Sequence, residues 1–117
     1  MDMLHSMQDD DVRDVRKKDT DAVWYDTDRA YTAYRQRIGN PDRIPPFSAQ
    51  DQDVRDAWKS AVVLFTNAGE KSGKQLYQRY SQAVGGVALK NKNVQLSEFE
   101  DMPELNRLAW CDAAEKV

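Results

Sequence analysis

The chain has 117 residues, of which 40% are apolar and 32% are charged, and its mean hydropathy is −0.84. This length predicts one folding domain, and the sequence has no run of about 18 apolar residues that would form a membrane-spanning helix. One cysteine and one histidine exclude a disulfide framework and a Cys/His zinc centre. The first residues also lack the basic and apolar regions of a secretory signal. We therefore expect a soluble, cytoplasmic protein with a small core.

The N-terminal region is acidic, although the formal net charge of the whole chain is only −3. Residues 1–28 contain nine aspartates and four basic residues, which gives this segment a net charge of −5. We predict that residues 1–28 form an acidic N-terminal segment and that residues 29–117 form a single helical domain. The segment is either a solvated extension or a surface that meets a basic site on a partner.

Five residues of the acidic segment are candidates for contact with a partner. Asp9, Asp10 and Asp11 form a charge run without the glycine of a calcium-binding loop, so we predict no metal there. Trp24 and Tyr25 have no counterpart later in the chain. This aromatic pair is either a lid that packs over the end of the helices or an anchor at a protein interface.

The rest of the chain contains an internal repeat. Residues 30–39 match residues 76–85 at an offset of 46, and residues 47–61 match residues 99–113 at an offset of 52. The matched residues include Tyr31 with Tyr77, Tyr34 with Tyr80, Gly39 with Gly85, Phe47 with Phe99 and Trp58 with Trp110. We predict two helix–loop–helix repeats, repeat one at 29–69 and repeat two at 72–115. Because a pair of short helices buries too little surface to fold alone, the repeated aromatic residues are expected to form one shared core. The alternative is that some of them line a pocket.

In repeat one, Thr20 or Thr27 is expected to cap a helix that ends at Gly39. Two prolines then predict an extended segment. Ser48 with Asp51 three residues later resembles a capping box, which would open a second helix with apolar residues at helical spacing.

In repeat two, Ser72 is expected to cap a helix that ends at Gly85. Residues 87–96 consist of two short apolar runs around a polar turn, which predicts a β-hairpin. Asp101 with Glu104 is expected to cap the last helix. The predicted fold class is therefore mainly α, a small helical domain of two helix–loop–helix repeats with a short β-hairpin at residues 87–96.

The middle of the chain is basic, because residues 70–96 contain five basic residues and one glutamate. The basic residues are Lys71, Lys74, Arg79, Lys90 and Lys92. They form either an ordinary solvated surface or a site for phosphate or nucleic-acid contact. The acidity of the whole chain makes nucleic acid the less favoured partner.

No arrangement of residues indicates catalysis. Cys111 has no histidine near it in the sequence, and His5 lies in the polar N-terminal segment. Residues 69–74 contain two glycines and a lysine but lack the spacing of a phosphate-binding loop. We therefore predict a non-enzymatic protein without catalytic residues, cofactor or metal.

Repeat two combines Leu76-Tyr77, Val84-Gly85-Gly86, Met102-Pro103, Arg107 and Ala109-Trp110. This combination resembles a short helical module of small accessory proteins of tailed phages and prophages. Repeat one fits the same pattern, but Gln50-Asp51 stand where the module has a leucine and a proline. The chain also has a fainter similarity, which rests mainly on a P-[FY]-x-x-x-x-x-x-[RK] stretch, to the ryanodine-receptor-type repeat, a helical module that can hold nucleotide-like ligands.

The phage resemblance implies a protein that binds and inhibits a host or anti-phage defence component in the host cytoplasm, as anti-CRISPR proteins do. Asp9, Asp10, Asp11, Trp24 and Tyr25 would then make the contact. One alternative is a module that binds a nucleotide or cyclic-nucleotide signal. A second alternative is a nucleic-acid-binding or minor virion or assembly protein. The oligomeric state stays open, and a homodimer is one option because apolar repeat edges can pair between chains.

Overall fold

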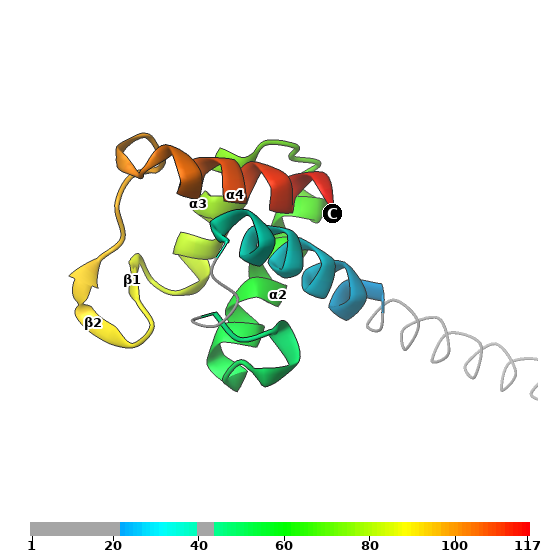
Figure 1. Cartoon of the computed structure of the whole chain (residues 1–117), viewed down its shortest axis with the longest axis horizontal. Coiled ribbons are helices and arrows are strands. Elements are labelled where there is room, and N and C mark those ends of the chain that lie inside the picture. The colour runs from blue at the N-terminus through cyan, green and yellow to red at the C-terminus, as the bar shows by residue number, and fades with distance from the viewer. Residues whose placement is uncertain (1–21, 40–43) are drawn as a thin grey trace, which may run out of the picture.

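Apolar residues recur every three or four positions along four segments, and each segment is helical in the computed structural model, which describes residues 22–39 and 44–117. The first helix covers residues 22–38 of the described part. It is followed by the 3₁₀ turn η1 (Phe47–Ala49), α2 (Gln52–Asn67), α3 (Gly73–Ala83), β1 (Val87–Ala88), β2 (Asn91–Gln95), the 3₁₀ turn η2 (Phe99–Asp101) and α4 (Glu104–Glu115). The predicted fold class is confirmed: the described chain is mainly helical, with two helix–loop–helix repeats and a small antiparallel hairpin (Figure 1).

The cap of α3 is the one that the sequence predicted correctly. The Ser72 hydroxyl accepts a hydrogen bond from the Gln75 backbone N–H, and the Gln75 side chain accepts one from the Ser72 backbone N–H at 3.1 Å. This reciprocal pair is a capping box, and it satisfies two of the amides that a helix start leaves free.

Of the other predicted N-caps, Thr27, Ser48 and Asp101 are wrong. Thr27 lies inside the first helix, where its hydroxyl donates to the Val23 carbonyl four residues back at 2.6 Å, and Thr20 lies outside the described residues. Ser48 lies within η1, and Asp51 occupies the N-cap position of α2 without a side-chain hydrogen bond. Ser48 is therefore part of a 3₁₀ turn that ends before the helix that it was expected to cap.

A 3₁₀ turn, η2, likewise precedes α4. Asp101 lies in η2, and Pro103 occupies the N-cap position. Asp101 is thus part of a turn whose own backbone bonds run from Asp101 N–H to the Glu98 carbonyl and from Met102 N–H to the Phe99 carbonyl. The two 3₁₀ turns occupy equivalent places, 52 residues apart, as do the starts of α2 and α4.

Matching tertiary contacts show that the two repeats are structurally equivalent. The Tyr31 hydroxyl donates to the Pro45 carbonyl at 2.6 Å, and the Tyr77 hydroxyl donates to the Ser97 carbonyl at 2.5 Å. Each tyrosine thus ties its helix to the loop two residues before the phenylalanine of the 3₁₀ turn. Helix formation in repeat one begins before residue 29, because residues 22–28 belong to the first helix, so a boundary between residues 28 and 29 falls inside a helix.

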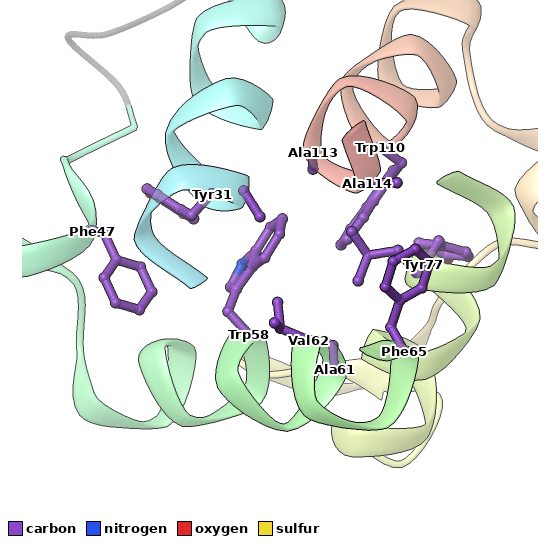
Figure 2. Close-up of a cluster of buried hydrophobic side chains, with 12 residues drawn as sticks. Tyr31, Phe47, Trp58, Ala61, Val62, Phe65, Tyr77, Trp110, Ala113 and Ala114 are labelled. Carbon is purple, nitrogen blue, oxygen red and sulfur yellow. The ribbon is translucent and has the colours of Figure 1, made fainter. Parts of the chain in front are cut away.

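The core sits between the repeats and is centred on two tryptophans. The rings of Trp58 from α2 and Trp110 from α4 stack with their centroids 4.8 Å apart and 10° between their planes (Figure 2). The surrounding contacts are reciprocal, as at an interface with twofold symmetry. Tyr34 of repeat one contacts Trp110 at 5.1 Å, and Tyr80 of repeat two contacts Trp58 at 5.8 Å. The prediction of one shared aromatic core is confirmed.

The hairpin is the main difference between the repeats. Val87 pairs with Gln95 in an antiparallel ladder, and the Leu96 N–H donates to the Gly86 carbonyl at 2.9 Å. Every residue of β2 is exposed. In Figure 1 the hairpin lies on the side of the helices opposite the start of the first helix, which is drawn in blue. None of the helices in the described part of the chain is both long enough and apolar enough to cross a bilayer.

Candidate functional site

A cleft of about 480 Å³ lies where the two repeats meet. Twelve of its sixteen lining residues are six equivalent pairs, one member from each repeat: Tyr31 and Tyr77, Tyr34 and Tyr80, Ile44 and Leu96, Gln50 and Met102, Val54 and Asn106, Trp58 and Trp110. The other four are Val94, Gln95, Ser97 and Pro103. The cleft is therefore a product of the repeat, because neither helix pair alone carries both walls.

Four aromatic rings form a continuous wall of the cleft. Tyr34 lies 5.4 Å from Trp58 and 5.1 Å from Trp110 between ring centroids. Tyr80 lies 5.4 Å from Trp110 and 5.8 Å from Trp58. Aromatic pairs at these separations contribute about 0.5–1.5 kcal/mol each beyond their buried area. Each tyrosine thus contacts both stacked tryptophans, which restricts the geometry of the wall.

The tyrosine hydroxyls differ in their hydrogen bonding. Tyr31 and Tyr77 are satisfied by loop carbonyls, and Tyr31 also accepts a hydrogen bond from the Gln50 side-chain amide at 2.5 Å. The hydroxyls of Tyr34 and Tyr80 make no hydrogen bond with the described residues. An equivalent pair of phenol groups is therefore available at the cleft to donate to, or accept from, a bound molecule.

These phenols stay protonated at neutral pH. Burial raises the pKa of Tyr34, and the nearby Tyr31 and Tyr77 add to the effect. Burial, helped by Tyr34, Asp53 and Tyr77, raises the pKa of Tyr80 to about 12. No residue that lines the cleft in the described structure carries a formal charge. The polar groups available are therefore neutral: hydroxyls, and the side-chain amides of Gln and Asn.

This arrangement of side chains suits the binding of a small molecule better than it suits catalysis. Ser97 is the only serine that lines the cleft in the described part of the chain, and no histidine, lysine or carboxylate lines the cleft with it. A serine needs such a base beside it to become a nucleophile. The half-buried rings of Tyr34 and Tyr80 can instead contact a planar group, whose edge can form hydrogen bonds with the neutral donors and acceptors beside them. Trp58 and Trp110, 3% and 4% exposed, support these two rings from the core.

The residues predicted to contact a partner protein are separated by the fold. Asp9, Asp10 and Asp11 lie outside the described residues. Trp24 is half-buried and packs against Phe47 at 6.1 Å between ring centroids, with the Lys59 ammonium 4.9 Å from its own ring. Tyr25 is 66% exposed and lines a second hollow of about 380 Å³ on the outer face of the first helix.

The predicted basic residues do not act as five free cations. Arg79 donates two hydrogen bonds to the Glu70 carboxylate, at 2.9 and 3.0 Å, and Lys74 forms an ion pair with Glu100. Lys71, exposed at the start of α3, and Lys90 and Lys92, exposed on the hairpin, form no ion pair with the described residues. Two of the five charges are thus compensated within the fold.

Cys111 is a free, half-buried cysteine on α4, at the point where α4 crosses Gly73 of α3. Among the described residues, no group of three or more His, Cys, Asp or Glu side chains gathers where a metal ion could be held. His5 lies outside the described residues.

The sequence did not single out Gln50 or Asn106 as site residues. The only signal was their place in the repeat, because the equivalent position in the other copy holds an apolar residue in both cases. Of the repeated aromatics, Tyr31, Trp58, Tyr77 and Trp110 are buried, whereas Tyr34 and Tyr80 are half-buried. Comparison of the chain with protein-family models, curated proteins and solved structures finds no match.

Proposed function

We propose that the protein is a non-enzymatic ligand-binding module that holds a nucleotide or cyclic nucleotide in the cleft between its two repeats. The observation that supports this most is the aromatic wall of Tyr34, Trp58, Tyr80 and Trp110, which both repeats build together and which carries two hydroxyls without a partner among the described residues. Phenol groups at the open edge of the wall can donate to, or accept from, a bound molecule.

The size and chemistry of the cleft fit this class of ligand. Small-molecule sites commonly enclose about 300–1,000 Å³ and combine apolar walls with a few polar groups. The cleft, at about 480 Å³, lies within that range. Stacking of a base on an aromatic side chain contributes about 1–3 kcal/mol, and it tolerates every base because each has a π-face. The proposal therefore follows from the aromatic wall rather than from a particular base.

The test is a titration of the full chain with nucleoside monophosphates, cyclic mononucleotides and cyclic dinucleotides, followed by tryptophan fluorescence. Two of the three tryptophans line the cleft, so a bound ligand is expected to quench the emission. Tyr80→Phe should weaken binding about fivefold to tenfold through loss of one hydrogen bond. Tyr25→Phe removes the same hydroxyl from an exposed site outside the cleft and serves as the control. Absence of quenching by every ligand at about 1 mM, the weak limit of specific binding, would contradict the proposal.

A second candidate is an accessory protein that blocks a host or defence protein. It is favoured by Tyr25, which is 66% exposed beside Arg29 and forms no contact with the core. Large exposed aromatics that flank charged groups are typical anchors of protein interfaces. Tyr25→Ala is expected to abolish capture of a partner from host lysate, and exchange of Asp9, Asp10 and Asp11 for Asn should weaken it in a salt-dependent way. Capture that survives both changes would refute this candidate.

A further inference from the structure

We infer that the cleft encloses an uncharged planar heterocycle whose edge is recognised by Gln50 and Asn106, while any phosphate of the ligand stays at the cleft mouth beside the β1–β2 hairpin. This inference rests on the proposed ligand-binding function and specifies which part of the ligand lies inside.

Within the described residues, the lining of the cleft carries no formal charge. All sixteen residues that line the cleft are neutral at physiological pH, including the four tyrosines. Moving an ionised phosphate out of water costs much free energy unless a charged or metal partner replaces the lost hydration. The lining offers no such partner, whereas an uncharged ring loses little on transfer and gains stacking with the aromatic wall.

The side-chain amides that line the cleft are placed asymmetrically between the two repeats. The aromatic residues of the lining are the same in both repeats, but the position of Gln50 in repeat one holds Met102 in repeat two, and the position of Asn106 in repeat two holds Val54 in repeat one. The Gln50 amide uses one N–H on Tyr31, and its carbonyl oxygen forms no hydrogen bond with the described residues. The Asn106 side chain likewise forms none with them. Both amides therefore keep donors and acceptors for a ligand edge, and their unequal placement selects one orientation and one ligand per chain.

Strand β2 lies at the mouth of the cleft, where a phosphate would remain in water. Val94 and Gln95 bring strand β2 into the lining of the cleft. Lys92 lies two residues before Val94 on β2, in the part of the strand where the pairing with β1 is irregular. Lys92 is exposed and forms no ion pair with the described residues. A phosphate at the mouth would meet this cation in water, where the attraction is weak and is screened by salt.

The experiment compares adenosine, guanosine, cytidine and uridine with their 5′-monophosphates by calorimetry on the full chain, at low and high salt. At least one nucleoside is expected to bind within about tenfold of its monophosphate, and salt should reduce the difference. Gln50→Met and Asn106→Val place in each position the residue or residue type of the other repeat. Each should weaken nucleoside binding about tenfold. Asn106→Val should leave the melting temperature unchanged, whereas Gln50→Met also removes the hydrogen bond to the Tyr31 hydroxyl and should lower it slightly. Gln78→Met makes the same exchange on the exposed face of α3 and should leave binding unchanged.

The outcomes separate this inference from the proposed function. If the monophosphates bind and no nucleoside does, the ligand class stands and the uncharged cleft occupant is refuted. If nucleosides bind, and the Gln50→Met and Asn106→Val proteins bind them as tightly as the wild type does, recognition by Gln50 and Asn106 is refuted. If neither nucleosides nor any phosphate-bearing ligand binds, the proposed function fails together with this inference.

Discussion

Gly73 allows α3 and α4 to cross at very close range, and Gly73→Ala is the sharpest perturbation of the fold. A Cβ atom at this position would lie 2.5 Å from the Cys111 backbone nitrogen, 2.6 Å from its Cα and 2.8 Å from its Sγ. Carbon atoms pack at about 3.5–4.0 Å, so the helices would have to separate by about 1 Å. Two of the three contacts are backbone atoms, and rotation of the Cys111 side chain cannot relieve them.

The expected cost follows from two opposing terms. Overpacking of this kind costs about 3 kcal/mol at the upper end of its usual range, and the better helix propensity of alanine returns at most about 1 kcal/mol. A net loss of about 2 kcal/mol should lower the melting temperature of a domain of this size by about 8 °C. Circular dichroism during thermal unfolding measures this directly. Gln78→Ala, an exposed exchange on the same helix, is the control and should change stability by less than about 0.5 kcal/mol.

The same variant tests the link between the crossing and the cleft. Tyr77 and Tyr80 lie on α3, and Trp110 directly precedes Cys111 on α4. Separation of the helices should therefore open the contacts of both tyrosines with Trp110, at 5.3 and 5.4 Å between ring centroids, and weaken any ligand of the cleft. Adding Cys111→Ala removes only Sγ and should restore less than half of the stability. A Gly73→Ala protein that melts like the wild type, or one that Cys111→Ala restores fully, would refute the reasoning.

Three further predictions concern caps, titration and ion pairs. Ser72→Ala should cost about 1 kcal/mol in urea unfolding by removal of the capping box, and an unchanged midpoint would contradict that role. Because the pKa of Tyr80 is raised from 10.0 to about 12 in the fold, its contribution to stability is complete below pH 10 and is lost as the pH rises toward 12. The loss of stability at alkaline pH, measured by unfolding with tyrosinate absorbance, should therefore be less steep in Tyr80→Phe than in the wild type. Identical pH profiles of the two proteins would argue against this contribution of Tyr80. Arg37 and Asp112 join the first helix to α4 with side chains 43% and 29% exposed, so a double-mutant cycle should give a coupling of about 0.2–1 kcal/mol that falls with salt. A coupling that salt leaves unchanged would show that the pair is buried in solution.

The repeat made much of the architecture predictable. Trp58 and Trp110 match at a constant offset, which predicted that both belong to one shared core. In the structure they lie next to the axis between the repeats, where equivalent residues contact each other. Ser72 was predictable as a cap because a local pattern decides it. The hairpin at residues 87–96 was predictable because its polar turn separates two apolar runs.

The 3₁₀ turns were not predictable from the sequence. Three residues are too few to show a periodicity, and Ser48 with Asp51 matches the capping-box pattern that such a turn replaces. The cleft was missed for a different reason. Gln50 and Asn106 are ordinary polar residues within their own segments, and only the packing of one repeat against the other brings them to the same hollow. Their proposed role depends on distances between residues far apart in the chain, which periodicity and spacing do not contain.

The residues 68–72 that join α2 to α3 have a consequence beyond connecting two helices. They hold each repeat at a permanently high effective concentration relative to the other, so the tryptophan stack forms at any protein concentration. A dimer of two identical single repeats would have to present the same side chain on both sides of its cleft. The covalent link removes that constraint, and the exchanges of Gln50 against Met102 and of Val54 against Asn106 use the freedom that it gives.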